Sequence, residues 1–304
     1  MDIHPLHVHT PLIFSQYLKQ KTGKSVHFKL EALQPSGSFK IRGIGRLCQQ
    51  YVLEGKTKFV ASSGGNAGIA VAYAGQQLGI PTTVFIPSTS HARYIQEIEL
   101  YGADVIVAGD VWDDAHRAAS EFARTHDAAY IPPFDHPLLW AGHASMLYEV
   151  AETGLRPDVV LAAVGGGGLA CGLLEGMHQQ SWEDIPLIAV ETAGADSFAQ
   201  SVHTGSLITL PKITSRATSL GAKRITSALW DWRTRHEIQS VVVSDDEAER
   251  GARAFARDKR VLVELSAGAP LSLVYDTHEV LASYQDILVI VCGGVGTFFF
   301  EGLG

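Results

Sequence analysis

The stretch VVLAAVGGGG, residues 159–168, joins an uninterrupted apolar run to four consecutive glycines. An apolar residue at every position of such a short run is typical of a parallel strand that is buried on both faces. Glycines let backbone N–H groups approach an anion closely, and a helix that starts after them adds the positive end of its dipole. Tight packing of a helix on a strand also uses glycine, but four in succession favour an anion site. The stretch therefore predicts a buried strand, an anion-binding turn and a helix.

Apolar runs of this kind recur along the chain and are separated by stretches with helical periodicity. The predicted strands are residues 58–61, 82–86, 104–107, 159–164, 187–190, 241–243 and 287–291, and the clearest helices are residues 66–78, 113–124 and 246–257. Alternating strands and helices predict an α/β fold with open parallel sheets and right-handed crossovers.

The length of the chain indicates two domains. It has 304 residues, which is about twice the length of a typical domain. Because no long linker separates two halves, we expect one domain to be inserted into the other. The expected small domain covers residues 41–137, and the expected large domain covers residues 1–40 and 138–304, with no regulatory domain.

Composition excludes several classes of protein. Hydrophobic residues make up 46% and charged residues 18% of the chain, which is typical of a folded globular protein and not of a disordered or coiled-coil chain. The formal net charge is −8 and there is no long basic run, so we expect no nucleic-acid partner.

Other sequence features indicate where the protein is located in the cell. Residues 1–15 lack the basic start of a signal peptide, and the longest uncharged stretch, residues 159–174, is too short to span a membrane. The three cysteines are too widely spaced for a disulfide framework or a Cys-x-x-Cys metal site, and they suit a reducing cytosol. We therefore expect a cytoplasmic protein that does not enter a membrane.

Two further glycine loops follow predicted strands, SSGGNAG at residues 62–68 and CGG at residues 292–294. Ligands of open parallel sheets bind at the carboxyl ends of the strands, so these are candidate ligand loops. The dinucleotide motif G-x-G-x-x-G fits residues 165–172 only with its third glycine displaced. Glu191 is available as the ribose-binding acid of such a motif, so a dinucleotide site stays open.

The stretch PSGSFKIRG, residues 35–43, predicts a turn followed by a helix that Ser38 caps. Lys40 then lies in the first helical turn, where the helix dipole disfavours a positive charge. A lysine kept neutral is the nucleophile that Schiff-base chemistry needs. An isolated lysine is ordinarily a surface residue, so the other motifs decide its role.

Four motifs occur in order, namely SGSFKIRG around Lys40, SSGGNAG, the tetraglycine, and VCGG at residues 291–294. Together they resemble the fold type II pyridoxal-phosphate enzymes, and most closely the catabolic L-serine/L-threonine dehydratases. The stretches that fit the same branch are IPPFD at 131–135, GHAS at 142–145, ETAGA at 191–195 and LPKITS at 210–215. The resemblance spans roughly residues 11–294 and implies the fold of the tryptophan synthase β subunit.

The resemblance implies a role for each residue of a cofactor site. Lys40 holds pyridoxal 5'-phosphate through a Schiff base, Phe39 packs against the pyridine ring, and Asn66 hydrogen-bonds its phenolic oxygen. The phosphate is cradled by Gly165, Gly166, Gly167 and Gly168. Cys292 faces the ring nitrogen, where a neutral thiol cannot stabilise a pyridinium as a carboxylate would. This favours elimination over transamination.

The resemblance also implies a substrate site and a cation site. The substrate carboxylate is received by the backbone amides of Ser63, Gly64, Gly65 and Asn66 at the start of a helix. A monovalent cation, K⁺, is held by Glu191 and by main-chain carbonyls near Gly165, Ala195, Leu220 and Ala222.

The implied reaction is the elimination of water from L-serine, L-threonine or both, in which Lys40 removes the Cα proton. The products are pyruvate or 2-oxobutanoate and ammonia, as expected for a homodimeric ammonia-lyase of amino-acid catabolism. Serine racemases of this family have a serine just before the Gly-Asn pair of the substrate loop, whereas this chain has Gly64. We therefore expect elimination without efficient racemisation.

The chain departs from the dehydratase pattern at two places. VCGG is followed by VGTFFF, where the dehydratases continue with serine and asparagine, and ELSAGA at residues 264–269 has leucine in place of the usual proline. Three alternatives stay open. They are another fold type II enzyme (a β-replacement synthase or a dehydratase for a different β-hydroxyamino acid), a non-catalytic pyridoxal-phosphate binding protein, and a nicotinamide-dependent oxidoreductase that uses the tetraglycine.

Overall fold

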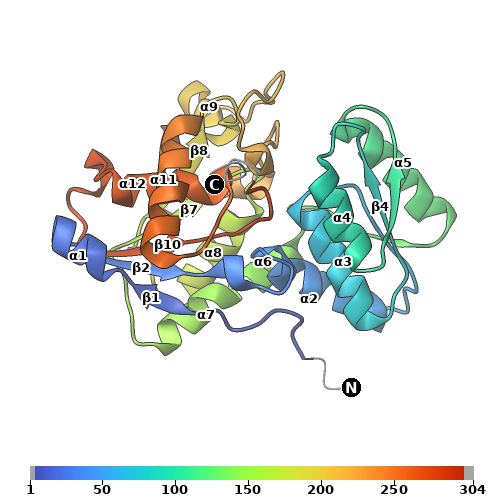
Figure 1. Cartoon of the computed structure of the whole chain (residues 1–304), viewed down its shortest axis with the longest axis horizontal. Coiled ribbons are helices and arrows are strands. Elements are labelled where there is room, and N and C mark those ends of the chain that lie inside the picture. The colour runs from blue at the N-terminus through green and yellow to red at the C-terminus, as the bar shows by residue number, and fades with distance from the viewer. Residues whose placement is uncertain (1–3, 298–304) are drawn as a thin grey trace. The chain divides into compact units, whose positions relative to one another are not determined.

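The computed structural model describes residues 4–297, which form two compact units. The smaller unit comprises the described residues up to Val8 together with Gln34–Gly142, and the larger comprises His9–Leu33 and the described residues from His143 onward. Figure 1 labels many of the elements of both units. The domain boundaries expected from the sequence, at residues 40/41 and 137/138, stay a prediction.

The larger unit is built on a six-stranded sheet in the order β1-β2-β10-β7-β8-β9 (Figure 1). Its strands are β1 (Leu12–Phe14), β2 (Ser25–Lys29), β7 (Val159–Ala163), β8 (Leu187–Thr192), β9 (Ile238–Val243) and β10 (Asp286–Ile290). All neighbouring strands are parallel except β1 and β2, which are antiparallel. Every residue of β7 and β8 is buried, as predicted for parallel strands with helices on both faces.

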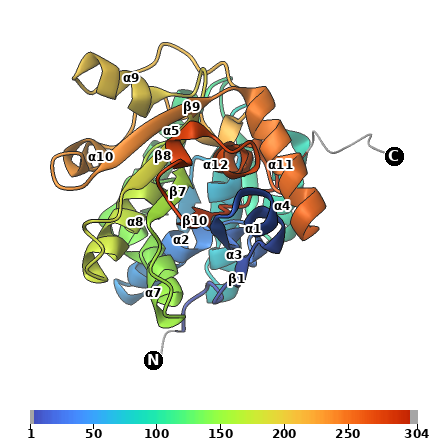
Figure 2. The same cartoon turned by 90° about the vertical axis from the view of Figure 1, so that its left-hand side faces the viewer.

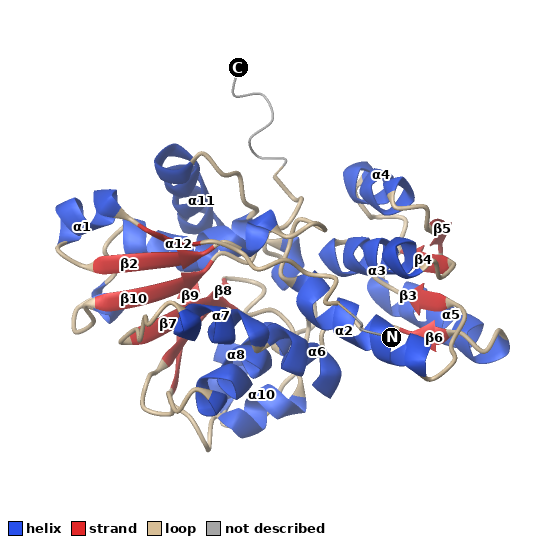
Figure 3. Cartoon of the chain, turned by 90° about the horizontal axis from the view of Figure 1, so that it is seen from below, coloured by secondary structure: helices blue, strands red, loops and turns tan. Residues whose placement is uncertain are grey.

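Helices cover both faces of this sheet (Figures 2 and 3). One face carries α7 (Ser145–Glu152), α8 (Gly168–Gln179) and α10 (Ser227–Trp232), and the other carries α1 (Gln16–Thr22), α11 (Asp245–Lys259) and α12 (Leu265–Tyr275). Helix α9 (Ser197–Thr204) contacts β9. Three short 3₁₀ helices are η1 (Glu31–Leu33), η2 (Thr218–Leu220) and η3 (Glu279–Leu281).

The smaller unit contains a four-stranded parallel sheet in the order β5-β4-β3-β6. Its strands are β3 (Phe59–Ala61), β4 (Thr82–Ile86), β5 (Asp104–Val107) and β6 (Ala129–Tyr130). The helices of this part of the chain are α2 (Lys40–Leu53), α3 (Asn66–Leu78), α4 (Ala92–Leu100), α5 (Trp112–Thr125) and α6 (Pro137–His143). Right-handed crossovers require α3 and α4 on one face of the sheet and α5 on the other, because the chain reverses direction across the sheet after β5.

Each sheet has a point at which its strand order reverses. The chain runs outward from β3 to β4 and β5 and then returns to β6, on the other side of β3. In the larger sheet it runs from β7 to β8 and β9 and returns to β10, on the other side of β7. Open α/β sheets bind ligands at the carboxyl ends of the strands at such switch points. The loops that follow β3, β6, β7 and β10 are therefore the candidate ligand loops.

Most predicted elements are confirmed, but β1, β2 and β6 were not predicted. Strand β2 ends in Lys29, whose side chain is completely buried. Its ammonium group donates a hydrogen bond to the Thr10 carbonyl, at 2.6 Å, and forms a buried ion pair with Glu149. Because Lys29 is a charged residue, β2 does not appear in the sequence as an apolar run and was not recognised as a buried strand. Strand β6 is only two residues long, too short to show a period.

Candidate functional site

The side chain of Lys40 lies at the start of helix α2, as predicted. Its Nζ donates a hydrogen bond to the carbonyl oxygen of Pro133, at 2.7 Å, and lies 5.0 Å from the centre of the Phe39 ring. Pro133 lies in the loop after β6, so the amine is held at the carboxyl edge of the smaller sheet. Sequence reasoning missed Pro133 as a partner, because it quoted this stretch only for its resemblance.

The predicted cap of this helix is wrong. The residue before α2 is Phe39, in helical conformation, and no side chain caps the helix. The hydroxyl groups of Ser36 and Ser38 are buried without a hydrogen-bond partner among the described residues. Buried polar atoms of this kind call for an explanation such as a bound polar ligand. The turn before Lys40 thus fits a group that brings its own hydrogen-bonding atoms.

The substrate loop predicted at Ser63–Asn66 follows β3 and leads into α3, which begins at Asn66. Gly65 is the residue before the helix, has an extended backbone and provides no side-chain cap. The first N–H groups of a helix have no partner within the helix, so they attract an anion such as a carboxylate. A Cβ atom at Gly68 would lie 1.9 Å from the Ser63 carbonyl oxygen, so glycine is needed for the loop to close onto the helix.

The tetraglycine follows β7 and starts α8, as predicted. Gly167 has a φ of +93°, a conformation that favours glycine, and α8 begins at Gly168. A Cβ atom at Gly165 would lie 3.0 Å from the Cα of Leu220, so the two backbones are in close contact. Backbone N–H groups at the start of a helix, with no side chains to fill the turn, fit a phosphate group.

Cys292 lies after β10, at the switch point of the larger sheet, and is 5% exposed. Its sulfur lies 4.0 Å from the hydroxyl oxygen of Ser266. The Ser266 hydroxyl donates a hydrogen bond to the carboxylate of Glu264. A Cβ atom at Gly294 would lie 2.0 Å from the carboxyl carbon of Glu264, so the loop passes directly over that carboxylate. Sequence reasoning singled out residues 264–269 only for their missing proline and did not assign Ser266. Residues 298–300, the phenylalanines of the unusual ending, lie outside the described residues.

Glu191 lies in β8, one residue before its end, and its side chain is fully buried. Its two carboxylate oxygens accept hydrogen bonds from the backbone N–H groups of Phe198 and Ala199, at 2.9 and 2.7 Å, at the start of α9. Burial raises the pKa of Glu191 to about 8, against the smaller lowering effect of these hydrogen bonds. The adjacent Ser197 hydroxyl is buried without a partner among the described residues.

The residues expected around a cation are only partly brought together by contacts. Leu220 packs against Gly165, and its carbonyl accepts a hydrogen bond from the N–H of Ala222, at 2.8 Å. Val164 N–H donates a hydrogen bond to the Val190 carbonyl, at 2.9 Å, so the residue before Gly165 lies beside Glu191 of β8. A buried carboxylate beside an unsatisfied hydroxyl fits a cation of low charge, whereas its inward orientation does not fit ribose recognition.

Residues 4–297 contain neither a side-chain cluster for a metal ion nor a membrane-spanning helix. No group of three or more His, Cys, Asp and Glu side chains in this part of the chain is arranged to hold a metal ion. None of its helices is long and apolar enough to cross a membrane.

Comparison with known proteins gives matches over nearly the whole chain. A family model described as "Pyridoxal-phosphate dependent enzyme" matches residues 3–293. The chain is 44% identical over 306 residues to the L-serine dehydratase/L-threonine deaminase of Homo sapiens, which covers 97% of this chain and 93% of that protein. A fungal L-serine ammonia-lyase from Rhizomucor miehei matches with a TM-score of 0.91 and 37% identity over 96% of both chains. Maize serine racemase matches with a TM-score of 0.89 and 26% identity over 97% of this chain and 92% of that one.

These matches agree with the fold and with the glycine loops found at the switch points of the two sheets. The predicted α/β fold with parallel sheets is confirmed, and it is the fold of the fold type II enzymes that use pyridoxal phosphate. The matching family uses pyridoxal phosphate, so the match does not support the alternative of a nicotinamide-dependent oxidoreductase. The inward-facing carboxylate of Glu191 is consistent with this outcome. With its fold, its motif order and its sequence matching over nearly its whole length, the chain belongs to the family of pyridoxal-phosphate dependent enzymes.

Proposed function

We propose that this protein is an ammonia-lyase that removes water from L-serine and L-threonine and yields pyruvate or 2-oxobutanoate and ammonia. The observation that carries the proposal is that Lys40 and the glycine loop at the start of α3 lie at the same switch point, after β6 and β3. A base and a carboxylate-binding loop on one sheet edge suit α-proton removal from an amino acid. The names of the relatives in Homo sapiens and Rhizomucor miehei support the same reaction.

The cofactor supplies the chemistry that side chains lack. Bound pyridoxal phosphate acts as an electron sink for the charge that develops at the α-carbon of the substrate. Gly165–Gly168 would bind its phosphate through backbone N–H groups, Phe39 and Asn66 would contact its ring, and Cys292 would face the ring nitrogen as a neutral thiol. Each of these assignments fits the geometry of its own unit.

Lys40 has two tasks in this proposal. Its amine would anchor the cofactor covalently, and its Nζ would accept the proton from the α-carbon of the substrate. The carbonyl of Pro133 orients the amine, and the N-terminal end of the α2 dipole favours its neutral form. The backbone amides of residues 63–66 hold the substrate carboxylate, so the α-carbon is presented in a fixed orientation.

A monovalent cation at Glu191 completes the proposal. The carboxylate of Glu191 is fully buried, and the groups that donate hydrogen bonds to it within residues 4–297 are two backbone N–H groups. A K⁺ ion would neutralise this charge and fix the turns around Leu220 that pack on Gly165. The homodimeric state and the cytoplasmic location stay predictions.

The experiment that tests the function compares the wild-type protein with Lys40→Ala. We expect the wild type to show the visible absorbance of protein-bound pyridoxal phosphate and to form pyruvate from L-serine and 2-oxobutanoate from L-threonine. Lys40→Ala should lose both the absorbance band and turnover, because it removes both the covalent anchor of the cofactor and the proton acceptor.

Lys56→Ala is the matched control, because Lys56 pairs with Asp127 at the surface of the same unit. It should keep both properties. A non-catalytic binding protein would show the absorbance band without forming a 2-oxo acid, and a β-replacement synthase would consume a second nucleophile. Either result would contradict the proposal.

A further inference from the structure

A chain of hydrogen-bonded side chains starts at Ser62, just before the substrate loop, and ends on helix α5. The Ser62 hydroxyl oxygen lies 2.6 Å from the Tyr130 hydroxyl oxygen, which lies 2.8 Å from Nδ1 of His116. Ser62 is fully buried, whereas His116 is half-buried. All three residues belong to the smaller unit. The chain therefore links the residue just before the substrate loop to the surface.

Tyr130 lies between two parts of the proposed site. It is the last residue of β6 and pairs in register with Val60 of β3, two residues before Ser62. Three residues further on, the Pro133 carbonyl accepts the hydrogen bond from Lys40. Tyr130 is thus placed to fix the spacing between the substrate loop and the lysine.

The ring and the hydroxyl of Tyr130 have different roles. The ring packs against an apolar cluster formed by β3, β4 and α5, while the hydroxyl reaches Ser62 and His116. Burial raises the pKa of the Tyr130 phenol above its ordinary value, so the hydroxyl stays protonated and can donate one hydrogen bond while accepting another. Replacement by phenylalanine would remove this function and keep the packing.

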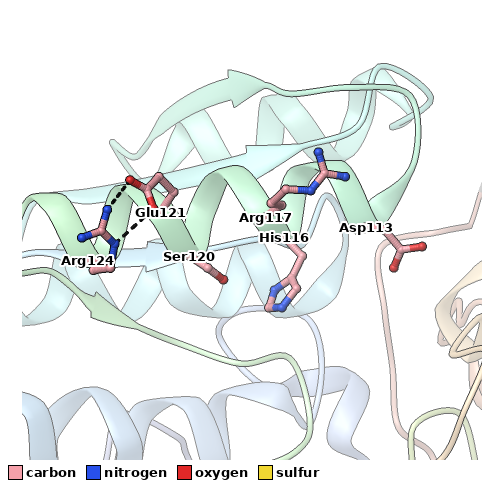
Figure 4. A pocket seen from close by; sticks show the side chains of 6 residues that line it. All are labelled: Asp113, His116, Arg117, Ser120, Glu121 and Arg124. Carbon is pink, nitrogen blue, oxygen red and sulfur yellow. Dashed lines mark hydrogen bonds and ion pairs between the residues drawn. The ribbon is translucent and has the colours of Figure 1, made fainter.

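His116 is held in place from the other side. Its ring stacks on Trp112, with 4.8 Å between ring centres and 5° between ring planes, and meets the Tyr130 ring edge-on at 5.4 Å. Figure 4 shows it projecting from α5 beside a surface depression. The residues that line this depression are Asp113, His116, Arg117, Ser120, Glu121 and Arg124.

The substrate loop gains from such an external anchor because Gly64 and Gly65 follow each other within it. Two successive glycines have high conformational freedom, and ordering them costs entropy each time the carboxylate binds. A hydrogen bond at Ser62 fixes the direction in which the loop leaves β3. The loop then loses less conformational entropy when the carboxylate binds.

We propose that Tyr130 and His116 are positioning residues that hold the substrate loop, through Ser62, in the conformation that receives the amino-acid carboxylate. The inference rests on the proposed function for its substrate. It extends that function by adding two residues outside the substrate loop, one of them on the far side of the sheet from α3.

The first measurement is hydrogen exchange of the holoenzyme without substrate, followed in peptides that contain residues 62–66. We expect faster exchange in Tyr130→Phe and a smaller increase in His116→Phe, which keeps a ring on Trp112. The KM for L-serine should rise about 2- to 12-fold in Tyr130→Phe, the range for the net loss of one hydrogen bond, while kcat changes much less. Ser62→Ala combined with Tyr130→Phe should be no worse than the stronger single variant, because both break the same link.

Tyr51→Phe is the matched control, since it removes a phenolic hydroxyl from the last turn of α2 in the same unit. It should leave exchange in residues 62–66 and the KM unchanged. Unchanged exchange in Tyr130→Phe, or additive effects of the Ser62 and Tyr130 variants, would overturn the inference. Because exchange is measured without substrate, an enzyme that fails to turn over serine would contradict the proposed function alone.

Discussion

Glu191 is the residue whose charge should dominate the response to pH. Its folded pKa is about 8, chiefly because of burial, against 4.5 for an ordinary glutamate. Between these values the folded protein retains a proton that the unfolded chain has released. The free energy of unfolding therefore falls as pH rises, by about 1.4 kcal/mol per pH unit for one group, and the full contribution is present only below the unfolded pKa.

A bound K⁺ ion should offset this loss, because it favours the ionised carboxylate. We expect K⁺ to raise the melting temperature of the wild type more at pH about 8.5 than at pH about 6, relative to a bulky organic cation. Glu191→Gln should lose both the pH-dependent decline and the K⁺ effect. Glu183→Gln, which changes an exposed glutamate of the same unit, is the control. An equal K⁺ effect in Glu191→Gln would contradict the proposed site.

Gly64 should decide the stereochemical outcome of the reaction. Racemisation needs an acid–base group on each face of the α-carbon, and Gly64 provides no side chain at the position where the resembling racemases have serine. Loss of a positioned acid–base group typically costs about 10²–10⁴-fold in rate. We expect chiral chromatography to find D-serine forming far more slowly than pyruvate; comparable rates would mean that another second base exists.

The space around Gly64 sharpens this prediction. A Cβ atom there would lie 2.3 Å from the hydroxyl oxygen and 3.0 Å from the Cβ of Ser90. Gly64→Ser alone should therefore distort the loop and raise the KM for L-serine. Combining it with Ser90→Gly removes both contacts and should bring the KM back toward the wild-type value. Ser90→Gly should not rescue an unrelated loop variant in this way.

At the scale of elements, helices α11 and α12 of the larger unit pack closely against each other. Every residue of α12 is buried, including the polar Ser266 and Ser272, because the sheet covers one side and α11 the other. A Cβ atom at Gly251 in α11 would lie 2.4 Å from the Gly268 carbonyl oxygen and 2.5 Å from the Ser272 nitrogen. Backbone lies against backbone here, so no side chain can move aside.

Gly251→Ala should therefore lower stability although alanine favours a helix. We expect a loss of about 1–3 kcal/mol or more in the free energy of unfolding, the range for overpacking a core, measured by urea denaturation. Arg257→Ala, an exposed substitution on the same helix, should stay near the wild type. A more stable Gly251→Ala variant would show that the two helices can separate without cost.

At the scale of the whole molecule, cofactor binding should stabilise the folded chain by mass action. Removing pyridoxal phosphate should lower the melting temperature, and adding it back should restore it. The gain is about 2.7 kcal/mol at a free concentration of about 100 Kd. NAD is the control ligand and should have no effect. A melting temperature raised by NAD and not by pyridoxal phosphate would contradict the family's cofactor for this chain.

Several features of the protein were determined by the sequence alone because they depend on short-range patterns. Helix α3 was predicted as residues 66–78 and has those bounds, since helical periodicity and a glycine before the first turn lie within one short stretch. The buried strand β7, the glycine turn and the start of α8 follow from VVLAAVGGGG in the same way. The lysine motif placed Lys40 in the first turn of α2 for equally local reasons.

Other features were decided only by the tertiary structure, because their partners are distant in the sequence. Burial of Lys29 in β2 depends on Glu149, 120 residues away, and the amine of Lys40 is oriented by Pro133, 93 residues away. Ser62 meets Tyr130 across 68 residues, through a strand too short to show a period. Hydrophobic periodicity and turn chemistry act over a few neighbouring residues, whereas the pairing of buried polar groups depends on which strands the fold brings together.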